Sequence, residues 1–324
     1  MTDGKGRTID YLRVSVTDRC NLRCVYCMPA QGVEPEPYEN LLTLEEITRV
    51  CAAAARLGIS KIKVTGGEPL VRKGCTQLVG MLKAIPGIRE VTMTTNGVLL
   101  PRELPALVEN GLDAVNISLD TLDPERFLAL TRCPLEENVR EAIGQAVKAG
   151  VKVKVNAIPI EEYNGGGLAQ LAELAKDQPV DVRFIELMPI GEGKNLTPIP
   201  GQEVRRRLEA AHGPMTPWEG KRGNGPAVYY SLPGFVGKIG FISAISQEFC
   251  GSCNRVRLTS TGYLKLCLHY NDGVALREAV RSGAGEEELA EVIREAILHK
   301  PLHHDFGGCE TANMDHHTMA QIGG

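Results

Sequence analysis

Short apolar runs alternate with longer stretches of helical periodicity along the first 190 residues. Runs rich in β-branched residues predict strands, and six of them lie at 11–16, 61–65, 90–95, 114–120, 151–158 and 182–188. The stretch 43–58 predicts a helix, with a capping box from Thr43 to Glu46 and a stop at Gly58. The alternation predicts six βα units and a parallel sheet.

Six units are too few to close an eight-stranded barrel, so the pattern allows an open partial barrel or a doubly wound sheet. The pattern changes after Met188, because residues 189–201 are rich in Pro and Gly. We therefore expect one domain over 1–190 and a second region over 191–324. The second region is expected to hold shorter elements: a helix at 202–211 and strands at 227–232 and 238–243.

Small and polar residues gather where the predicted strands end, in the segments "VTGGEP", "TTNG", "NISLD" and "FIELMP". Ligands of parallel sheets collect at the carboxyl ends of the strands. Four such ends together predict a shared pocket.

Composition narrows the classes of protein. The net charge of −4 gives no reason to expect nucleic acid as a partner, and no apolar run is long enough to span a membrane. The first 14 residues lack the apolar segment of a signal peptide, so we expect a cytoplasmic protein whose thiols stay reduced. The ten cysteines are therefore not expected to form a disulfide framework.

Three cysteines, Cys20, Cys24 and Cys27, have the spacing C-x3-C-x2-C and are called here the first cysteine triad. A structural zinc site needs four ligands, and the next cysteine, Cys51, lies inside a predicted helix, where it is expected to pack in the core. A 4Fe–4S cluster held by three cysteines keeps one open iron, which a small molecule with an amine and a carboxylate can chelate.

The second cysteine triad is Cys250, Cys253 and Cys267, with the spacing C-x2-C-x13-C. It fits either a zinc site with His269 as fourth ligand or a second cluster with an open iron. Two open irons would imply two ligands. No role is assigned to Cys75, Cys133 and Cys309.

The first triad, with Tyr26 before its third cysteine and Gly66-Gly67-Glu68-Pro69 after the second strand, resembles the radical S-adenosylmethionine (SAM) superfamily. There, SAM binds the open iron and is reductively cleaved to a 5′-deoxyadenosyl radical. "CGSCNRVRLT" and the terminal "IGG" resemble one family within it, the molybdenum cofactor biosynthesis protein A family of GTP 3′,8-cyclases. This likeness runs from about residue 10 to the last residue.

The resemblance implies an α/β fold, a partial (βα)6 TIM-type barrel with a C-terminal extension that carries a second 4Fe–4S cluster and binds substrate. It implies conversion of GTP to 3′,8-cyclo-7,8-dihydro-GTP, the first step of molybdenum cofactor biosynthesis. It also implies two 4Fe–4S clusters, SAM, an external electron donor and a homodimer. The product would pass to a downstream cyclic pyranopterin monophosphate synthase.

The resemblance also implies site residues. Those matching SAM contacts are Tyr26, Gly67, Ser118 and Met188, and those matching GTP contacts are Arg13, Lys63, Thr94, Lys154, Arg183, Arg255 and Arg257. Most relatives carry arginine in place of Lys63. Gly323 and Gly324 would thread into the cavity, where the terminal carboxylate could pair with an arginine.

The sequence supports these cations independently. Arg13, Lys63 and Lys154 lie inside predicted strands of a parallel sheet, where a buried cation needs an anionic partner. Arg255 and Arg257 are two positions apart and share one face of an extended segment. The chain has no G-x4-G-K-[ST] loop, so side chains would have to neutralise a nucleotide's phosphates.

Two other functions stay open at this point. One is a radical SAM enzyme that modifies a peptide, although such enzymes usually have more C-terminal cysteines. The other is an electron carrier with two clusters, which would need closed four-cysteine sites and no "GGEP" segment.

Overall fold

The structure is a computed structural model that describes residues 1–324 except 221, 307–312, 316 and 324. Its centre is a sheet of 12 strands in the order β12-β11-β10-β1-β2-β3-β4-β5-β6-β9-β8-β7. The strands from the first half of the chain are β1 (Tyr11–Ser15), β2 (Lys61–Thr65), β3 (Glu90–Thr95), β4 (Ala114–Ser118), β5 (Lys152–Ala157) and β6 (Val180–Ile185). These six are parallel neighbours in chain order, as the apolar pattern predicts.

The region after residue 190 extends the same sheet at both edges. The bounds of its strands are β7 (Thr216–Trp218), β8 (Val228–Ser231), β9 (Ile239–Ile242), β10 (Arg255–Leu258), β11 (Tyr263–Lys265) and β12 (Gly273–Ala275). Strand β9 is parallel to β6 and β10 is parallel to β1, so eight consecutive strands of the sheet are parallel. The pattern predicted only six of them, because the pairing of a short returning strand is not encoded locally. The proposed boundary at residue 190 stays a prediction.

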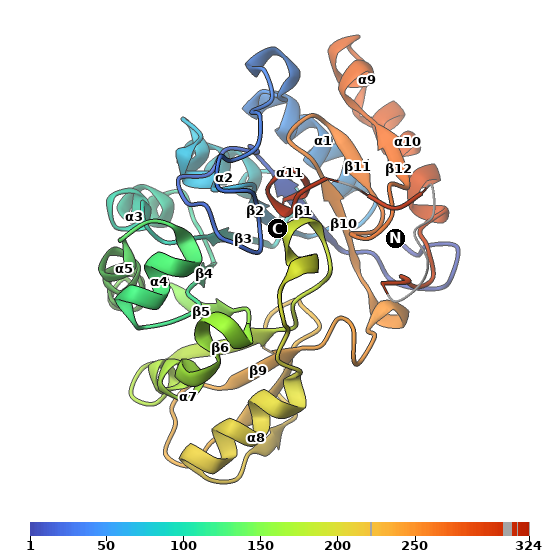
Figure 1. Cartoon of the computed structure of the whole chain (residues 1–324). Helices are drawn as coiled ribbons and strands as arrows, with labels where there is room; N and C mark the ends of the chain where they lie inside the picture. The colour runs from blue at the N-terminus through green and yellow to red at the C-terminus, as the bar shows by residue number, and fades with distance from the viewer. Residues whose placement is uncertain (221, 307–312, 316, 324) are drawn as a thin grey trace.

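Helices cover the outer side of the curved sheet (Figure 1). They are α1 (Leu44–Arg56), α2 (Cys75–Lys83), α3 (Leu100–Glu109), α4 (Pro124–Thr131), α5 (Glu136–Lys148), α6 (Glu161–Asn164), α7 (Leu168–Ala172), α8 (Gly201–His212), α9 (Arg277–Arg281) and α10 (Glu286–Leu298). The short helix α11 (Met319–Ile322) is not part of this layer, because it ends the C-terminal segment and lies against Cys27. The predicted capping box of α1 is present: Glu46 N donates to Thr43 Oγ1 at 3.1 Å, and Thr43 N donates to Glu46 Oε2 at 2.8 Å. Cys51 is fully buried in this helix, as expected.

Alternation along the strands separates apolar from basic side chains. Leu12 and Val14 of β1 are buried in the core that the helices cover, so Arg13 points to the opposite, inner face of the sheet. Arg257, Arg13 and Lys63 are Cα partners across β10, β1 and β2. The register therefore gathers cations from separate strands on this inner face.

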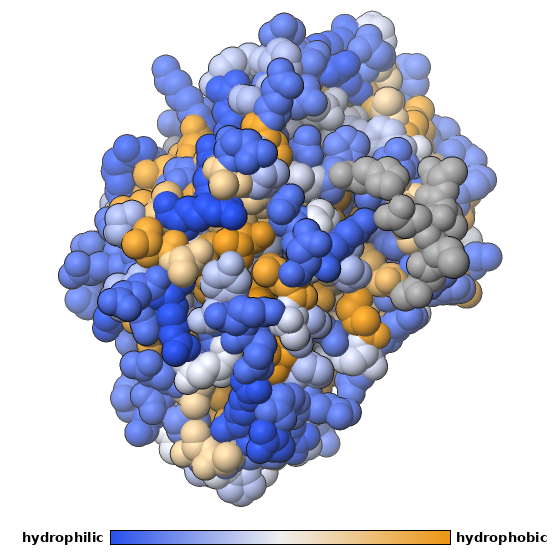
Figure 2. Space-filling view, in the orientation of Figure 1, coloured by the Kyte–Doolittle hydropathy of each residue, from blue (hydrophilic) through white to orange (hydrophobic). Residues whose placement is uncertain are grey.

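No described helix is both long enough and apolar enough to cross a membrane. The face seen in Figure 2 is mostly polar, with apolar residues in scattered groups.

Candidate active site

The two cysteine triads lie at opposite ends of the parallel sheet. The first triad follows the carboxyl end of β1, whereas Cys250 and Cys253 precede the amino end of its parallel neighbour β10. Cys267 follows β11, whose antiparallel direction returns the chain to that same end. A five-residue strand is roughly 17 Å long, so about one strand length separates the triads.

The "GGEP" segment packs directly on the loop that carries the first triad. Gly67 N donates to Thr17 O at 2.7 Å, and Glu68 N donates to Arg19 O at 2.8 Å. A Cβ atom on Gly67 would lie 2.4 Å from Arg19 O, so only glycine fits there. The backbone that approaches Gly67 this closely is that of Asp18 and Arg19.

Glu68 organises the loop further, although the sequence pattern predicts no separate role for this residue. It is fully buried and accepts hydrogen bonds from the Thr95 hydroxyl and Asn96 N, both at 2.7 Å. Burial raises the pKa of Glu68 to about 7, against the opposing effect of these bonds. The Asn96 amide donates to Asn21 Oδ1 at 2.7 Å and lies 3.8 Å from Cys20 Sγ.

The four predicted SAM residues come from loops or strand ends at this carboxyl edge. Tyr26 donates its hydroxyl proton to Asp120 Oδ2 at 2.8 Å, and Ile158 N donates to Asp120 Oδ1 at 2.7 Å. Burial raises the pKa of Asp120 to about 6. Ser118 ends β4, and Met188 follows the end of β6. These groups lie at the carboxyl edge of the sheet, and the shared pocket that the sequence predicts there stays a prediction.

The donor set of the first triad fits a cluster better than one ion. Burial raises the pKa of Cys20 to about 11 and that of Cys27 to about 12, so the thiols need a bound cation to lose their protons at neutral pH. A tetrahedral zinc ion holds its sulfur ligands about 3.8 Å apart, given Zn–S bonds of about 2.3 Å. Among the described residues, neither triad brings its three sulfur atoms within 4.8 Å of one another. Wider spacing suits cysteines that bind different irons of one cluster.

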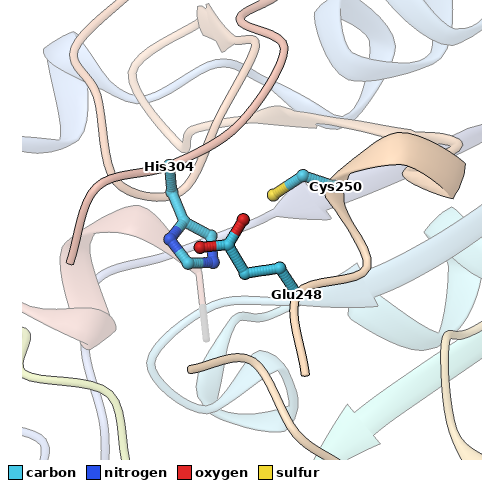
Figure 3. A group of neighbouring side chains, drawn as sticks. All are labelled: Glu248, Cys250 and His304. Carbon is cyan, nitrogen blue, oxygen red and sulfur yellow. The ribbon is translucent and has the colours of Figure 1, made fainter. Parts of the chain in front are cut away.

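Cations and a histidine surround the second triad. Although burial opposes it, Lys300 and Arg255 lower the pKa of Cys253. Glu248, Cys250 and His304 bring their donor atoms within 4.8 Å of one another (Figure 3). His269, the alternative zinc ligand, is not part of this group.

The inner face carries all six of the cations that the sequence predicts as GTP contacts: Arg13, Lys63, Lys154, Arg183, Arg255 and Arg257. Burial lowers the pKa of Lys63 well below its usual value, and the neighbouring Arg183 and Arg13 lower it further. Burial and the same kind of repulsion, from Arg13 and Arg255, lower the pKa of Arg257 to about 9. Such a surplus of buried positive charge predicts an anionic ligand.

The counter-charges for these cations are few in the described chain. Asp181, the register partner of Lys154, already forms an ion pair with Arg222, whose Nη1 atom lies 2.5 Å from Asp181 Oδ1. Arg183 has a neutral partner, because it donates to the Asn156 amide oxygen at 2.6 Å and 2.9 Å. Thr94 Oγ1 and Arg255 Nε are buried and have no hydrogen-bond partner among the described residues. These groups are available to a ligand.

A cavity of about 570 Å³ opens at the amino ends of β1, β2 and β10, next to the second triad. Its lining includes Lys61, Arg222, Tyr229, Ser252 and Arg255. The volume lies within the range of small-molecule sites.

The C-terminal segment enters the site from the first triad. Ala320 N donates to the Cys27 sulfur, and Arg257 Nη1 donates to Gly323 O at 2.9 Å. Gly323 has φ +86°, and a Cβ atom there would lie 2.8 Å from the Ser15 side chain. Figure 1 shows this end of the chain beside β1 and β10. Gly324 lies outside the described residues.

Comparison with known proteins agrees with this arrangement. Residues 14–175 match the radical SAM superfamily and residues 180–306 match Molybdenum Cofactor Synthesis C. The chain is 45% identical to the GTP 3′,8-cyclase of Clostridium perfringens over 324 residues, which is 100% of both chains. It is 46% identical to the GTP 3′,8-cyclase of Pelotomaculum thermopropionicum over 329 residues, again covering 100% of each.

Solved structures show the same fold. Streptococcus suis SuiB bound to S-adenosylmethionine has a TM-score of 0.60 at 14% identity, covering 89% of this chain and 68% of that one. Native anSMEcpe with bound AdoMet has a TM-score of 0.50 at 16% identity, covering 62% and 60%. At this identity the likeness concerns the fold alone.

The partial barrel and the three-cysteine loop at the end of its first strand define a radical SAM protein, a class that uses a 4Fe–4S cluster and SAM. The full-length identity to curated enzymes places it more narrowly. The chain belongs to the GTP 3′,8-cyclase family, as the sequence motifs predicted.

Proposed function

We propose that this enzyme converts GTP to 3′,8-cyclo-7,8-dihydro-GTP on the inner face of the sheet, between the two cysteine triads. The activity follows from its family, whose members are GTP 3′,8-cyclases, and the matched synthesis domain places it in molybdenum cofactor biosynthesis. The observation that carries the site assignment is the surplus of buried cations between the triads.

The first triad would hold the SAM-binding 4Fe–4S cluster, and the second triad would hold another. Tyr26, Gly67, Ser118 and Met188 would hold SAM at the carboxyl edge. When bound, the first cluster and SAM would supply the radical that removes the 3′ hydrogen of the ribose. The protein's own task is to orient GTP and to exclude water.

The cations of the inner face would neutralise the triphosphate. Arg13, Lys63 and Lys154 would contact it from strands β1, β2 and β5, and Arg183 from β6. Arg255 and Arg257 would hold the nucleotide near the second triad, and Thr94 would add a hydroxyl. Lys63 supplies charge without the bidentate geometry of the usual arginine.

The Gly323–Gly324 end would cover the inner face of the sheet beside Arg257. Arg257, which would also contact GTP, binds the Gly323 carbonyl, so the tail and the substrate would share one guanidinium. The tail would thereby position the substrate and close the site to solvent.

The remaining parts of the proposal concern partners. An external donor would supply the electrons, the enzyme would be a homodimer, and a cyclic pyranopterin monophosphate synthase would consume the product. Six ligand thiols must stay reduced for this chemistry, which favours the cytoplasm.

Anaerobic turnover tests the function directly. Reconstituted enzyme with SAM, dithionite and GTP deuterated at C3′ should give a product with the mass of 3′,8-cyclo-7,8-dihydro-GTP and deuterium in 5′-deoxyadenosine. Unlabelled 5′-deoxyadenosine alongside product would contradict abstraction at C3′. GTP returned unchanged by enzyme that cleaves SAM would contradict the substrate.

A further inference from the structure

Beside the second triad lies a group of ligand atoms of three chemical types. The Glu248 carboxylate, the Cys250 thiol and the His304 imidazole have donor atoms within 4.8 Å of one another. Figure 3 shows the three side chains converging from the loop before β10 and from the C-terminal segment. Thiolate, imidazole and carboxylate are the donors that Zn²⁺ uses in proteins.

The tautomer of His304 is set by its surroundings. His304 Nε2 is 2.8 Å from Ala244 O, and because a carbonyl only accepts, Nε2 carries the proton. The other nitrogen, Nδ1, is then unprotonated and carries a lone pair, and it is buried with no hydrogen-bond partner among the described residues. A ring nitrogen fixed by a carbonyl on its far side is the usual arrangement of a metal-ligating histidine.

Cys250 is also held in place before any metal binds. Arg7 Nη1 donates to Cys250 O at 3.0 Å, and His304 N donates to the Cys250 sulfur. Arg7 itself is fixed by Asp3 at 2.6 Å, in a pair that is almost fully buried. Glu248 is exposed, so its carboxylate can adjust its position to a bound ion.

We propose that Glu248, Cys250 and His304 bind one divalent transition-metal ion, of the type of Zn²⁺ or Fe²⁺, when the second triad holds no cluster. The thiolate and the carboxylate neutralise the charge of the ion, and water fills its fourth position. Since Cys250 also belongs to the second triad, the ion and the proposed second cluster exclude each other. This last step rests on the proposed function, whereas the binding of the ion does not.

Cobalt titration of the full chain tests the binding. The titration uses Co²⁺ with metal-free protein under reducing, anaerobic conditions, and Cys20, Cys24 and Cys27 are replaced by Ala to remove the first triad. In this background Cys253→Ala breaks the second triad but keeps the proposed site. It should bind one Co²⁺ with a thiolate charge-transfer band, and Zn²⁺ should displace the ion.

Further substitutions in that background identify the ligands. Added His304→Ala should weaken Co²⁺ binding at least about 100-fold, because loss of a direct ligand costs more than loss of an outer partner. Added Cys250→Ala should abolish the charge-transfer band, and added Glu248→Gln should weaken binding. His303→Ala, at the exposed neighbouring histidine, should leave it unchanged. Binding that survives His304→Ala, or that is lost in Cys253→Ala alone, would overturn the proposal.

Exclusion is measured separately, by iron content. In the otherwise native chain, Zn²⁺ added before reconstitution should lower bound iron by about half, and His304→Ala should remove this effect. Full iron loading in the presence of site-bound Zn²⁺ would overturn the exclusion. Product formation by the fully loaded native enzyme tests the proposed function independently.

Discussion

At the scale of single residues, Arg257 offers the sharpest separation of binding from stability. Arg257→Ala should weaken GTP binding by roughly tenfold to a hundredfold, since a charge-assisted contact contributes about 1.5–3 kcal/mol, and should leave SAM binding nearly unchanged. Because Arg13 and Arg255 repel Arg257, its loss should not lower the melting temperature of the ligand-free chain. Equilibrium binding of each ligand and thermal unfolding check this.

The matched control is Arg102→Ala, whose side chain is 72% exposed on α3. It should change neither affinity. If Arg257→Ala weakened GTP and SAM equally and also lowered the melting temperature, the residue would be structural.

Residues differ in how far the sequence could place them. Cations at alternate strand positions, such as Arg13 and Lys63, could be assigned to a buried face, because the strand period fixes which side chains share it. The contacts of Glu68 and Asp120 could not, since their partners lie on other strands and loops. The meeting of His304 with Cys250 likewise depends on the path of the C-terminal segment.

At the scale of elements, the C-terminal segment connects the two triads. Asp315 N donates to His269 O at 2.9 Å, and Asn271 N donates to Asn313 O at 2.8 Å, so the segment pairs with the loop after Cys267. It then reaches the first triad at Cys27 and the inner face at Arg257. The ion pair of Lys265 with Asp315, each side chain 2% exposed, anchors it.

Lys265→Met should therefore release this segment. Removing one partner of a buried pair costs about 3–5 kcal/mol, and undocking the segment returns Asp315 to water. The variant should continue to cleave SAM but form several-fold less product per 5′-deoxyadenosine.

Deletion of Gly323 and Gly324 should have the same effect on the ratio of product to 5′-deoxyadenosine. The deletion variant should recover some product when a peptide ending in Ile-Gly-Gly is added. Product and 5′-deoxyadenosine are measured by mass analysis.

Lys83→Met is the control, since its pair with Asp113 is partly exposed and belongs to α2. It should keep the native product ratio. A native ratio in Lys265→Met would mean that the ion pair does not hold the segment, and full cyclisation by the truncated chain would mean that the two glycines have no role.

The elements themselves were predicted unevenly. Strands β1 to β6 are short runs rich in β-branched residues, and this local pattern was enough to find them. Strand β10 reads "RVRL", in which the two arginines lie on the inner face of the sheet, and its partner β1 is about 240 residues away in sequence. That distance is why the parallel pairing of β10 was not predicted. The pairing of β9 with β6 was not predicted either, although the run 238–243 was predicted as a strand.

At the scale of the whole molecule, the triads at opposite ends of the sheet should assemble independently. Cys24→Ala should lose about half of the iron and all SAM cleavage, because the first cluster loses a ligand. Cys253→Ala should also lose about half of the iron and all cyclisation, yet keep the first cluster and bind SAM. Cys51→Ala, at a buried core position of α1, should retain the full iron content and serves as the control. Iron analysis, SAM binding and product analysis of the three variants check this.

Iron content equal to that of the native chain in Cys253→Ala would contradict a second cluster, and normal 5′-deoxyadenosine formation by Cys24→Ala would contradict the first. Loss of all iron in either variant would mean that the ends of the sheet fold as one unit, which is the outcome expected if the C-terminal segment couples the two triads in assembly as well as in catalysis.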